Sequence, residues 1–241
     1  MTRLGATIKT DVVVQVRNKL YAIGIGVGAL LAVLLAWLAG ADHLPSVVPA
    51  TLLLFVGGTT LLYVAGMIIF ERDEGTLHAV IVSPLRTLEY LWSKIITLSL
   101  LATLESVTMV GGAMLILSRF GAVPWPNVPL LLIGILTIGV IYTLMGIVLI
   151  VRYQKITDFL IPMAAIVSVL QLPFLHFLGL VEHPVFLIIP TSAPTMLMQG
   201  AFMPLAPWEW GYGVVYTVAM IGGFAVWAYR AFNKHIIMNL G

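Results

Sequence analysis

The sequence predicts an all-α membrane protein with six transmembrane helices, and three observations support this prediction. Of the 241 residues, 61% are hydrophobic and only 9% are charged, a composition that leaves a soluble domain too little polar surface. Six apolar stretches each reach the roughly 20 residues that a helix needs to cross a bilayer core. Eleven of the twelve Lys and Arg residues fall on one side of these stretches. We therefore treat 1–241 as a single transmembrane domain.

The predicted spans divide the chain almost from end to end. They are Tyr21–Ala39, Ala50–Phe70, Ile95–Leu117, Pro129–Val151, Phe159–Leu178 and Tyr212–Tyr229. The first apolar run follows a basic segment, as in a signal peptide, but it is longer than the hydrophobic region of such a peptide. We therefore expect it to remain in the protein as a membrane span.

The distribution of basic residues predicts the orientation in the membrane. Cytoplasmic loops of membrane proteins accumulate Lys and Arg, and Arg119 alone falls outside the side shared by the two termini. The other eleven basic residues precede the first span, follow the last, or lie in the two loops on the same side as the termini. The sequence thus predicts a multi-pass protein of the plasma (inner) membrane with both termini in the cytoplasm.

Residues 1–20 predict an amphipathic helix that lies in the membrane interface. Its apolar side chains recur every four residues, at Leu4, Ile8, Val12, Val16 and Leu20. The basic side chains fall mostly on the other sides of the helix, where they can reach anionic headgroups of the lipid bilayer. Such a helix is either a juxtamembrane anchor or a docking element for a cytoplasmic partner, and both roles are compatible.

Residues 71–94 predict a charged cytoplasmic elbow between the second and third spans. The residues expected to form its working surface are Glu71, Asp73, Glu74, Gly75, Thr76, Leu77, Val80, Ile81 and Pro84. The acids precede a short helix, whose exposed N–H groups favour negative charge, and Gly75 supplies the turn before the expected N-cap, Thr76. Pro84 behind Ser83 starts the next helix, which carries Lys94 at the headgroup level. The apolar face either docks on a cytoplasmic protein or lies flat on the membrane.

The outer segment 179–211 is too long for a turn and too broken by prolines for a span. A short helix is expected over Thr195–Met203, with Pro194 as its first helical residue behind Ser192. We expect this piece to re-enter the outer leaflet. An interfacial cap anchored by Trp208 and Trp210 is preferred to a substrate site.

The sequence lacks the common nucleotide-binding, metal-binding and hydrolase motifs. It has no Cys, no G-x-x-x-x-G-K-[ST], no H-E-x-x-H and no G-x-S-x-G, and its five His residues are scattered. The acids of the elbow are close neighbours on one helix end, so they diverge instead of enclosing a substrate. A formal charge of +2 is too small to indicate nucleic-acid binding. We expect no catalytic site, no metal site and no resident cofactor.

One acidic residue, Glu105, falls near the middle of the third predicted span, with Thr103 and Thr108 beside it. A carboxylate at the bilayer centre costs a few kcal/mol unless it is paired, protonated or turned to the bundle interior. We assign these three residues to the translocation path. Pairing of the carboxylate with Gln171, Tyr142 or His176 and contact with a cationic substrate are equally compatible with the sequence.

The elbow also resembles a known family. The stretch ERDEGTLHAVIVSPLRTLEYLWSKI is similar to the segment E-x-E-x-G-T-x-x-x-L-x-x-[ST]-P of ATP-binding-cassette type-2 exporter permeases, including a lysine ten residues after the proline. The matching residues are Glu71, Gly75, Thr76, Ser83, Pro84 and Lys94, and Asp73 stands where Glu is commoner. The outer stretch IIPTSAPTMLMQGAF is similar to an N-P-x-x-Y-x-x-x-A-x-R element of the family but lacks its Tyr and Arg. In length and form the chain is most similar to the small permease subunits of fluoroquinolone-type drug export systems.

The resemblance implies a mechanism. Permeases of this family work as dimers, and each bundle rests on a separate P-loop ATPase subunit that binds ATP and magnesium. ATP binding would push on the elbow through Leu77, Val80 and Ile81 and open a cavity outward. The implied cargo is a hydrophobic or amphipathic small molecule such as a drug, whose efflux gives antibiotic resistance. Homodimer and heterodimer are both open, and an ion-coupled secondary transporter or a non-transporting assembly scaffold are the alternative functions.

Overall fold

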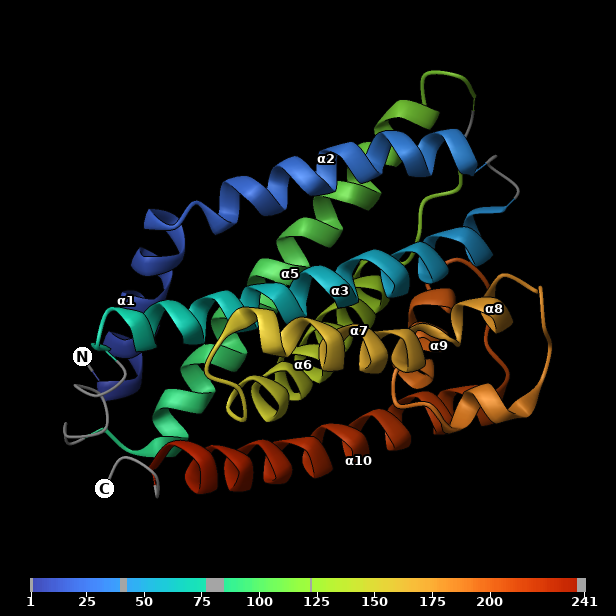
Figure 1. Ribbon diagram of the computed structural model, residues 1–241. Helices are drawn as coiled ribbons and strands as arrows, with labels where there is room; N and C mark the ends of the chain where they lie inside the picture. The colour runs from blue at the N-terminus through green and yellow to red at the C-terminus, as the bar shows by residue number, and fades with distance from the viewer. Residues whose placement is uncertain (1, 40–42, 77–84, 122, 238–241) are drawn as a thin grey trace.

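The computed structural model describes residues 2–39, 43–76, 85–121 and 123–237, and in these ranges every regular element is helical. Six helical segments are long and apolar enough to cross a membrane, which confirms the predicted fold class. The long helices run side by side as a bundle (Figure 1). The first helix and the end of the last long helix lie at the same end of the bundle, which we call the elbow end because the residues flanking 77–84 also lie there.

The elements follow one another along the chain with short connections. They are α1 (Arg3–Arg17), α2 (Leu20–Leu38), α3 (Leu44–Asp73), α5 (Thr87–Leu117), α6 (Val128–Ile150), α7 (Ile156–Gln171), α8 (Phe174–Phe177), η2 (Pro184–Ile188), α9 (Ser192–Gln199), α10 (Pro207–Phe232) and η3 (Asn233–Ile237). The spans are thus α2, α3, α5, α6, α7 with α8, and α10.

Helix α3 is longer at both ends than the predicted span. It begins at Leu44, with Pro45 in its first turn, where a proline loses no hydrogen bond. It runs to Asp73, so Glu71 and Asp73 belong to its last turn. Acids at a helix C-terminus face the negative end of the helix dipole, so they need cationic partners, which the fold supplies.

The predicted helix start at Pro84 is wrong. Helix α5 begins at Thr87, and Leu85 and Arg86 are not helical. The Glu89 carboxylate accepts a hydrogen bond from the Arg86 backbone N–H at 2.9 Å, which is half of a capping box and fixes the start of the helix there.

The fifth span is interrupted near its outer end. Helix α7 ends at Gln171, and Pro173 comes before the short α8, because a proline cannot continue the hydrogen-bond pattern of a helix. The Gln171 side chain donates to the Leu54 carbonyl of α3 at 2.5 Å. This bond ties the interruption to the core of the bundle.

The outer segment re-enters the bundle as α9, which spans Ser192–Gln199 where Thr195–Met203 was expected. The backbone turns helical directly after Thr191, so Ser192 is inside the helix and not its cap. Residues 192–198 are all buried. A methyl group added at Gly134 of α6 would lie 2.3 Å from Met198, so only glycine allows this approach. The segment therefore forms part of the core of the outer half.

Small residues also set the close contacts among the spans. Gly57 of α3 packs on the ring of Tyr142 of α6, where an added methyl group would lie 2.3 Å from the ring. Gly28 of α2 packs on the Glu105 carbonyl of α5, where an added methyl group would lie 2.7 Å from the carbonyl oxygen. Such contacts let helices approach closely in a membrane, where apolar side chains gain little from meeting each other instead of lipid. Helices α7 and α10 are mostly exposed at the bundle surface.

Candidate functional site

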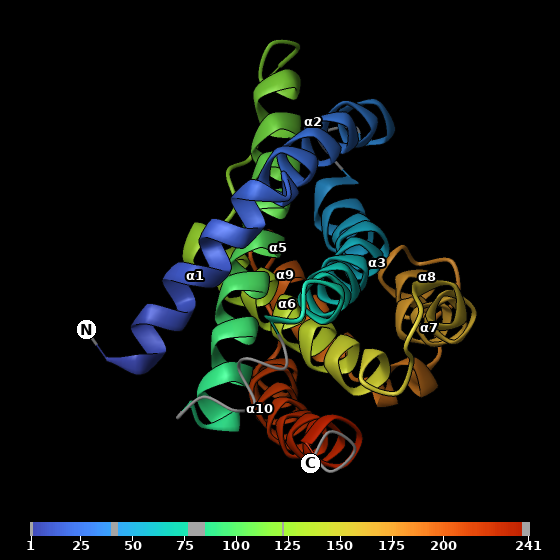
Figure 2. The same cartoon turned by 60° about the vertical axis from the view of Figure 1, so that its left-hand side comes forward.

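Five polar side chains from three helices meet at the elbow end of the bundle. They are Asp11 of α1, Glu71 of α3, and Tyr90, Ser93 and Lys94 of α5, and we call them the buried ion cluster. The Lys94 residue is 0% exposed, and the two carboxylate residues are 3% and 9% exposed. In Figure 2, α1 crosses α5. The ion cluster lies where α1 meets α5.

Each carboxylate of the cluster has one cationic and one neutral donor. Lys94 Nζ donates to Asp11 Oδ1 at 2.6 Å and to Glu71 Oε1. Ser93 Oγ donates to Asp11 Oδ2 at 2.5 Å, and Tyr90 OH donates to Glu71 Oε2 at 2.6 Å. Because all four carboxylate oxygens accept a hydrogen bond, the cost of burying two negative charges is offset. The cluster therefore joins α1, the end of α3 and the start of α5 into one unit.

The sequence interpretation missed this cluster for identifiable reasons. Lys94 was predicted only to lie at the headgroup level, whereas its side chain is completely buried and pairs with Asp11 and Glu71. The acids of the elbow were compared only with one another, so the approach of Glu71 to Asp11 of α1 through the lysine was not predicted. The available signal was an acid, Asp11, on the polar side of an otherwise basic helix.

Helix α1 contacts the bundle through two polar residues that its apolar pattern does not single out. Its buried residues are the polar Asp11 and Gln15, whereas Val13 and Val16 are more than half exposed. The first three residues of the predicted apolar stripe are half-buried, so the helix does not divide into a lipid-facing apolar side and a protein-facing polar side. Its place in the membrane interface stays a prediction, and its attachment to α5 is a contact that the pattern did not indicate.

Further contacts hold the residues that precede 77–84. Arg17 of α1 pairs with Glu74, with Nη2 at 2.7 and 2.9 Å from the two carboxylate oxygens. Arg72 donates to the Tyr153 carbonyl at 2.6 Å. Gly75 has a φ of +71°, which an L side chain rarely adopts, so glycine makes the turn that ends α3. Thr76 donates to the Glu71 carbonyl at 3.0 Å, so its hydroxyl satisfies the end of α3.

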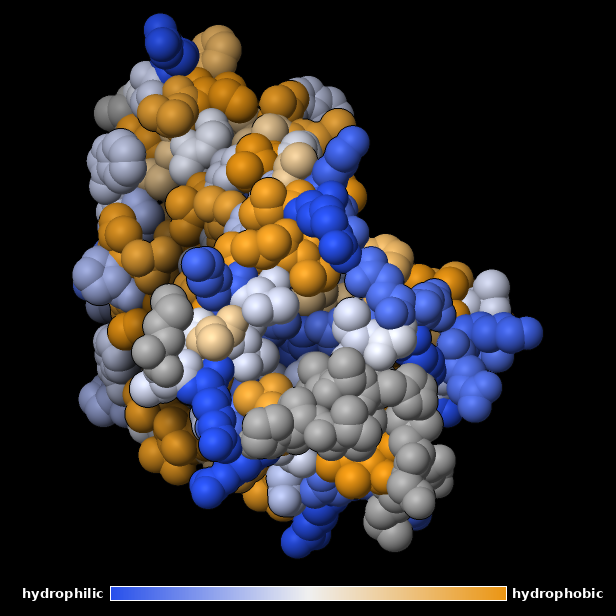
Figure 3. All heavy atoms as spheres, turned by 90° about the vertical axis from the view of Figure 1, so that its left-hand side faces the viewer, coloured by the Kyte–Doolittle hydropathy of each residue, from blue (hydrophilic) through white to orange (hydrophobic). Residues whose placement is uncertain are grey.

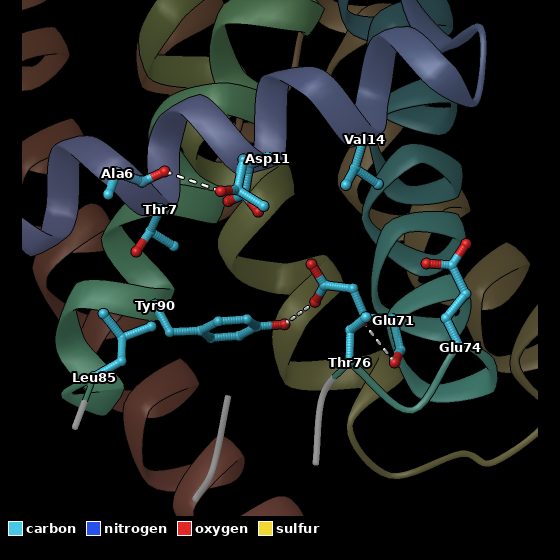
Figure 4. Close-up of a pocket in the computed structure, with 10 residues that line it drawn as sticks. Ala6, Thr7, Asp11, Val14, Glu71, Glu74, Thr76, Leu85 and Tyr90 are labelled. Carbon is cyan, nitrogen blue, oxygen red and sulfur yellow. Dashed lines mark hydrogen bonds between the residues drawn. The ribbon is translucent and has the colours of Figure 1, made fainter. Parts of the chain in front are cut away.

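A cavity of about 260 Å³ opens beside the cluster (Figure 4). Asp11 and Val14 come from α1 on one side, and Glu71, Glu74 and Tyr90 face them from the other. Seen from the elbow end, hydrophilic side chains gather on this face among apolar ones (Figure 3). The face thus combines charge with a hollow, as a docking surface does.

Of the predicted elbow residues, the structure describes those that precede position 77. Glu71, Asp73, Glu74, Gly75 and Thr76 lie at the elbow end, as described above. Leu77, Val80, Ile81 and Pro84 lie outside the described residues. Their proposed contact with an ATPase stays a prediction.

Glu105 is completely buried between α2, α3 and α5. Its carboxylate accepts hydrogen bonds from Thr59 Oγ1 at 2.9 Å and from Tyr63 OH at 2.8 Å, both on α3. Pairing with Gln171, Tyr142 or His176, one of the two alternatives that the sequence left open, is not found among the described residues. The other two predicted path residues, Thr103 and Thr108, donate to carbonyls of their own helix. A role of the three in translocation stays a prediction.

Comparison with known proteins places this geometry in a family. The model of the fluoroquinolones export permease protein family matches residues 2–240. The chain belongs to this family of permeases. It is 29% identical to the fluoroquinolones export permease proteins of two Mycobacterium tuberculosis strains, CDC 1551 / Oshkosh and ATCC 25618 / H37Rv. Each alignment covers 100% of this chain and 99% of the relative. The resemblance inferred from the elbow is confirmed at the level of this family.

For the permease, the buried ion cluster is the strongest candidate for a mechanical site. It lies at the end of α3 and the start of α5, and it connects these two helices to α1. Each of its carboxylate oxygens accepts a hydrogen bond from within the cluster. The arrangement can hold helices together and transmit a displacement between them.

Proposed function

We propose that the permease is the membrane subunit of an ATP-binding-cassette exporter. It moves a hydrophobic or amphipathic small molecule, such as a fluoroquinolone drug, outward across the plasma membrane. ATP hydrolysis takes place on a separate P-loop ATPase subunit, and two permease chains form the pathway. The relatives named as fluoroquinolone export permeases support the drug-like cargo.

The buried ion cluster is the observation that carries this proposal. Lys94 bonds both Asp11 and Glu71, so a force applied at the end of α3 reaches α1 and α5 as well. A secondary transporter needs no such rigid element at a cytoplasmic elbow, and its ion site is expected near the midplane in unwound helices. A permease subunit that is moved by a cytoplasmic ATPase does need a rigid element at the cytoplasmic elbow. The cluster therefore favours the ATP-driven exporter over a secondary transporter.

Reconstitution with a co-expressed P-loop ATPase tests the proposal. The two chains are expected to purify together and to show drug-stimulated ATP hydrolysis and drug export in vesicles. The double variant Leu77→Asp and Ile81→Asp is expected to insert normally and to lose the link between hydrolysis and export, because two carboxylates on an apolar docking face lack partners. Leu85→Asp, nearer the third span, serves as the comparison.

Three outcomes would contradict the proposal. Export in the absence of ATP, driven by an ion gradient alone, would identify a secondary transporter. Recovery of the permease only as a free oligomer in every detergent would remove the ATPase partner. Normal export by the double variant at the same ATP cost would show that the elbow is not the coupling element and lies on the membrane instead.

A further inference from the structure

An apolar groove lies between α5 and α6 in the half of the bundle away from the elbow end. Its volume is about 230 Å³. The residues that line it are Val107, Val110, Gly111 and Met114 of α5, Trp125 and Pro126 of the connection, and Val128, Leu131, Leu132 and Ile135 of α6. None of them carries a charge, and Val107 and Leu132 are exposed at the bundle surface. The groove is therefore open to whatever surrounds the spans.

The groove exists because α5 and α6 cross and then diverge. At Gly139 the helices touch, since an added methyl group would lie 3.4 Å from Ala102 and 3.5 Å from the Ser99 carbonyl. Farther along α5, a methyl group added at Gly111 would meet no atom within 4 Å. Beyond the crossing, α5 follows α2 away from α6 (Figures 1 and 2). The result is a wedge that widens toward the end of α5, with Trp125 at its wide end.

A cation stands beyond the wide end. Arg119 follows α5 in an exposed turn, five residues after Met114, and it is the one basic residue on the side of the membrane away from the termini. Within the described part of the chain, no ion pair involves its guanidinium. At 1.5 Å per helical residue, five residues place the Cα atom of Arg119 about 7 Å beyond that of Met114, past the end of the groove. Trp125 is the kind of residue that sits at the headgroup level.

From the wedge and its cation we propose that the groove binds one acyl chain of an anionic phospholipid, whose phosphate pairs with Arg119. The groove spans Val107 to Met114, about 10 Å of helix, which suits a section of an acyl chain. Drug-sized ligands occupy sites of roughly 300–1,000 Å³ with several polar contacts, and this groove is smaller and wholly apolar. The arginine selects a negative headgroup over a neutral one. A bound lipid would fill the wedge between two spans that otherwise diverge.

Native mass spectrometry of the purified full chain tests the proposal. The detergent-solubilised protein is mixed with phosphatidylglycerol or with phosphatidylcholine of the same acyl chains. We expect preferential retention of phosphatidylglycerol. Arg119→Gln is expected to lower that retention about fivefold, the effect of one basic residue near an anionic surface, while Arg119→Lys keeps most of it.

A second pair of variants tests the groove itself. Gly111→Phe places a ring in open space within the groove and is expected to remove the retained lipid. Gly26→Phe on α2 is the matched control, because a side chain there also meets no atom within 4 Å but lies outside the groove. The comparison requires that both variants keep the thermal stability of the parent protein. If Gly111→Phe is less stable, Gly111→Leu takes its place.

Several results would overturn the proposal. Equal retention of both lipids by the parent protein would show that Arg119 does not select an anionic headgroup. Unchanged lipid retention in Gly111→Phe would show that the groove is not the binding site. Loss of dimers in that variant, with lipid retention intact, would identify a second copy as the occupant, and competition of the lipid by a fluoroquinolone would identify the cargo.

Discussion

Replacing Lys94 by Met should free α1 from the rest of the permease. The lysine is completely buried and pairs with both Asp11 and Glu71. Methionine has a similar length and no charge, so the change leaves two carboxylates facing each other with one neutral donor each. Removing one partner of a buried pair costs about 3–5 kcal/mol because the remaining charge is uncompensated.

The cost can be relieved by local opening, because α1 contacts the bundle mainly at α5 and its release exposes the carboxylates to water. An opening made easier by about 3 kcal/mol is populated roughly a hundred times more often. Hydrogen exchange of the α1 amides, measured in lipid nanodiscs, should therefore accelerate by about that factor. The amides of α6, in the bundle core, should keep their protection.

Two controls sharpen this experiment. Lys155→Met removes a basic residue that precedes α7 and belongs to no described ion pair, so it should leave α1 exchange unchanged. The triple variant Lys94→Met, Asp11→Asn and Glu71→Gln removes all three charges and should restore most of the protection, because neutral amides can still accept from Ser93 and Tyr90. Equal exchange of α1 in Lys94→Met and in the parent protein would refute the role given to the buried ion cluster.

Three further predictions concern other parts of the fold. Gly57→Ala should lower the thermal midpoint by several degrees, since the methyl group meets the ring of Tyr142 at a cost of about 1–3 kcal/mol, whereas Gly26→Ala in open space should not. Glu105→Gln should keep thermal stability within about 1 kcal/mol, since an amide oxygen can still accept one of its two hydrogen bonds, and Glu105→Ala should lose more; the reverse order in unfolding assays would contradict the bonding. A cysteine at Thr2 should react with an impermeant reagent only in opened cells, and labelling of intact cells would reverse the orientation.

The sequence by itself determined the number and approximate position of the spans. Each segment that crosses a bilayer must be long and apolar, and it must form its backbone hydrogen bonds within itself. These requirements can be checked along the sequence without knowing the tertiary structure. The composition of each stretch is enough to apply that test. The exact ends of the helices were harder to predict from the sequence, because polar caps and interhelical contacts decide where a helix stops. Helix α3 extends to Asp73, and α5 begins at Thr87.

The elbow motif was also local, so the linear sequence was enough to indicate the family. Its glycine, threonine and proline stand at fixed spacing within one short stretch. The partners of Lys94, in contrast, could not be predicted from this stretch. Lys94 meets Asp11 across 83 positions of sequence and Glu71 across 23.

Tertiary structure alone decided which polar residues share a site. Glu105 bonds Thr59 and Tyr63, and the alternatives that the sequence offered were also polar residues of other helices far away along the chain. Hydrogen bonds depend on distances of about 3 Å between atoms on different helices, and these are set by helix rotation and crossing. In this protein, glycines such as Gly28 and Gly57 fix that crossing by admitting a neighbouring helix where any side chain would collide.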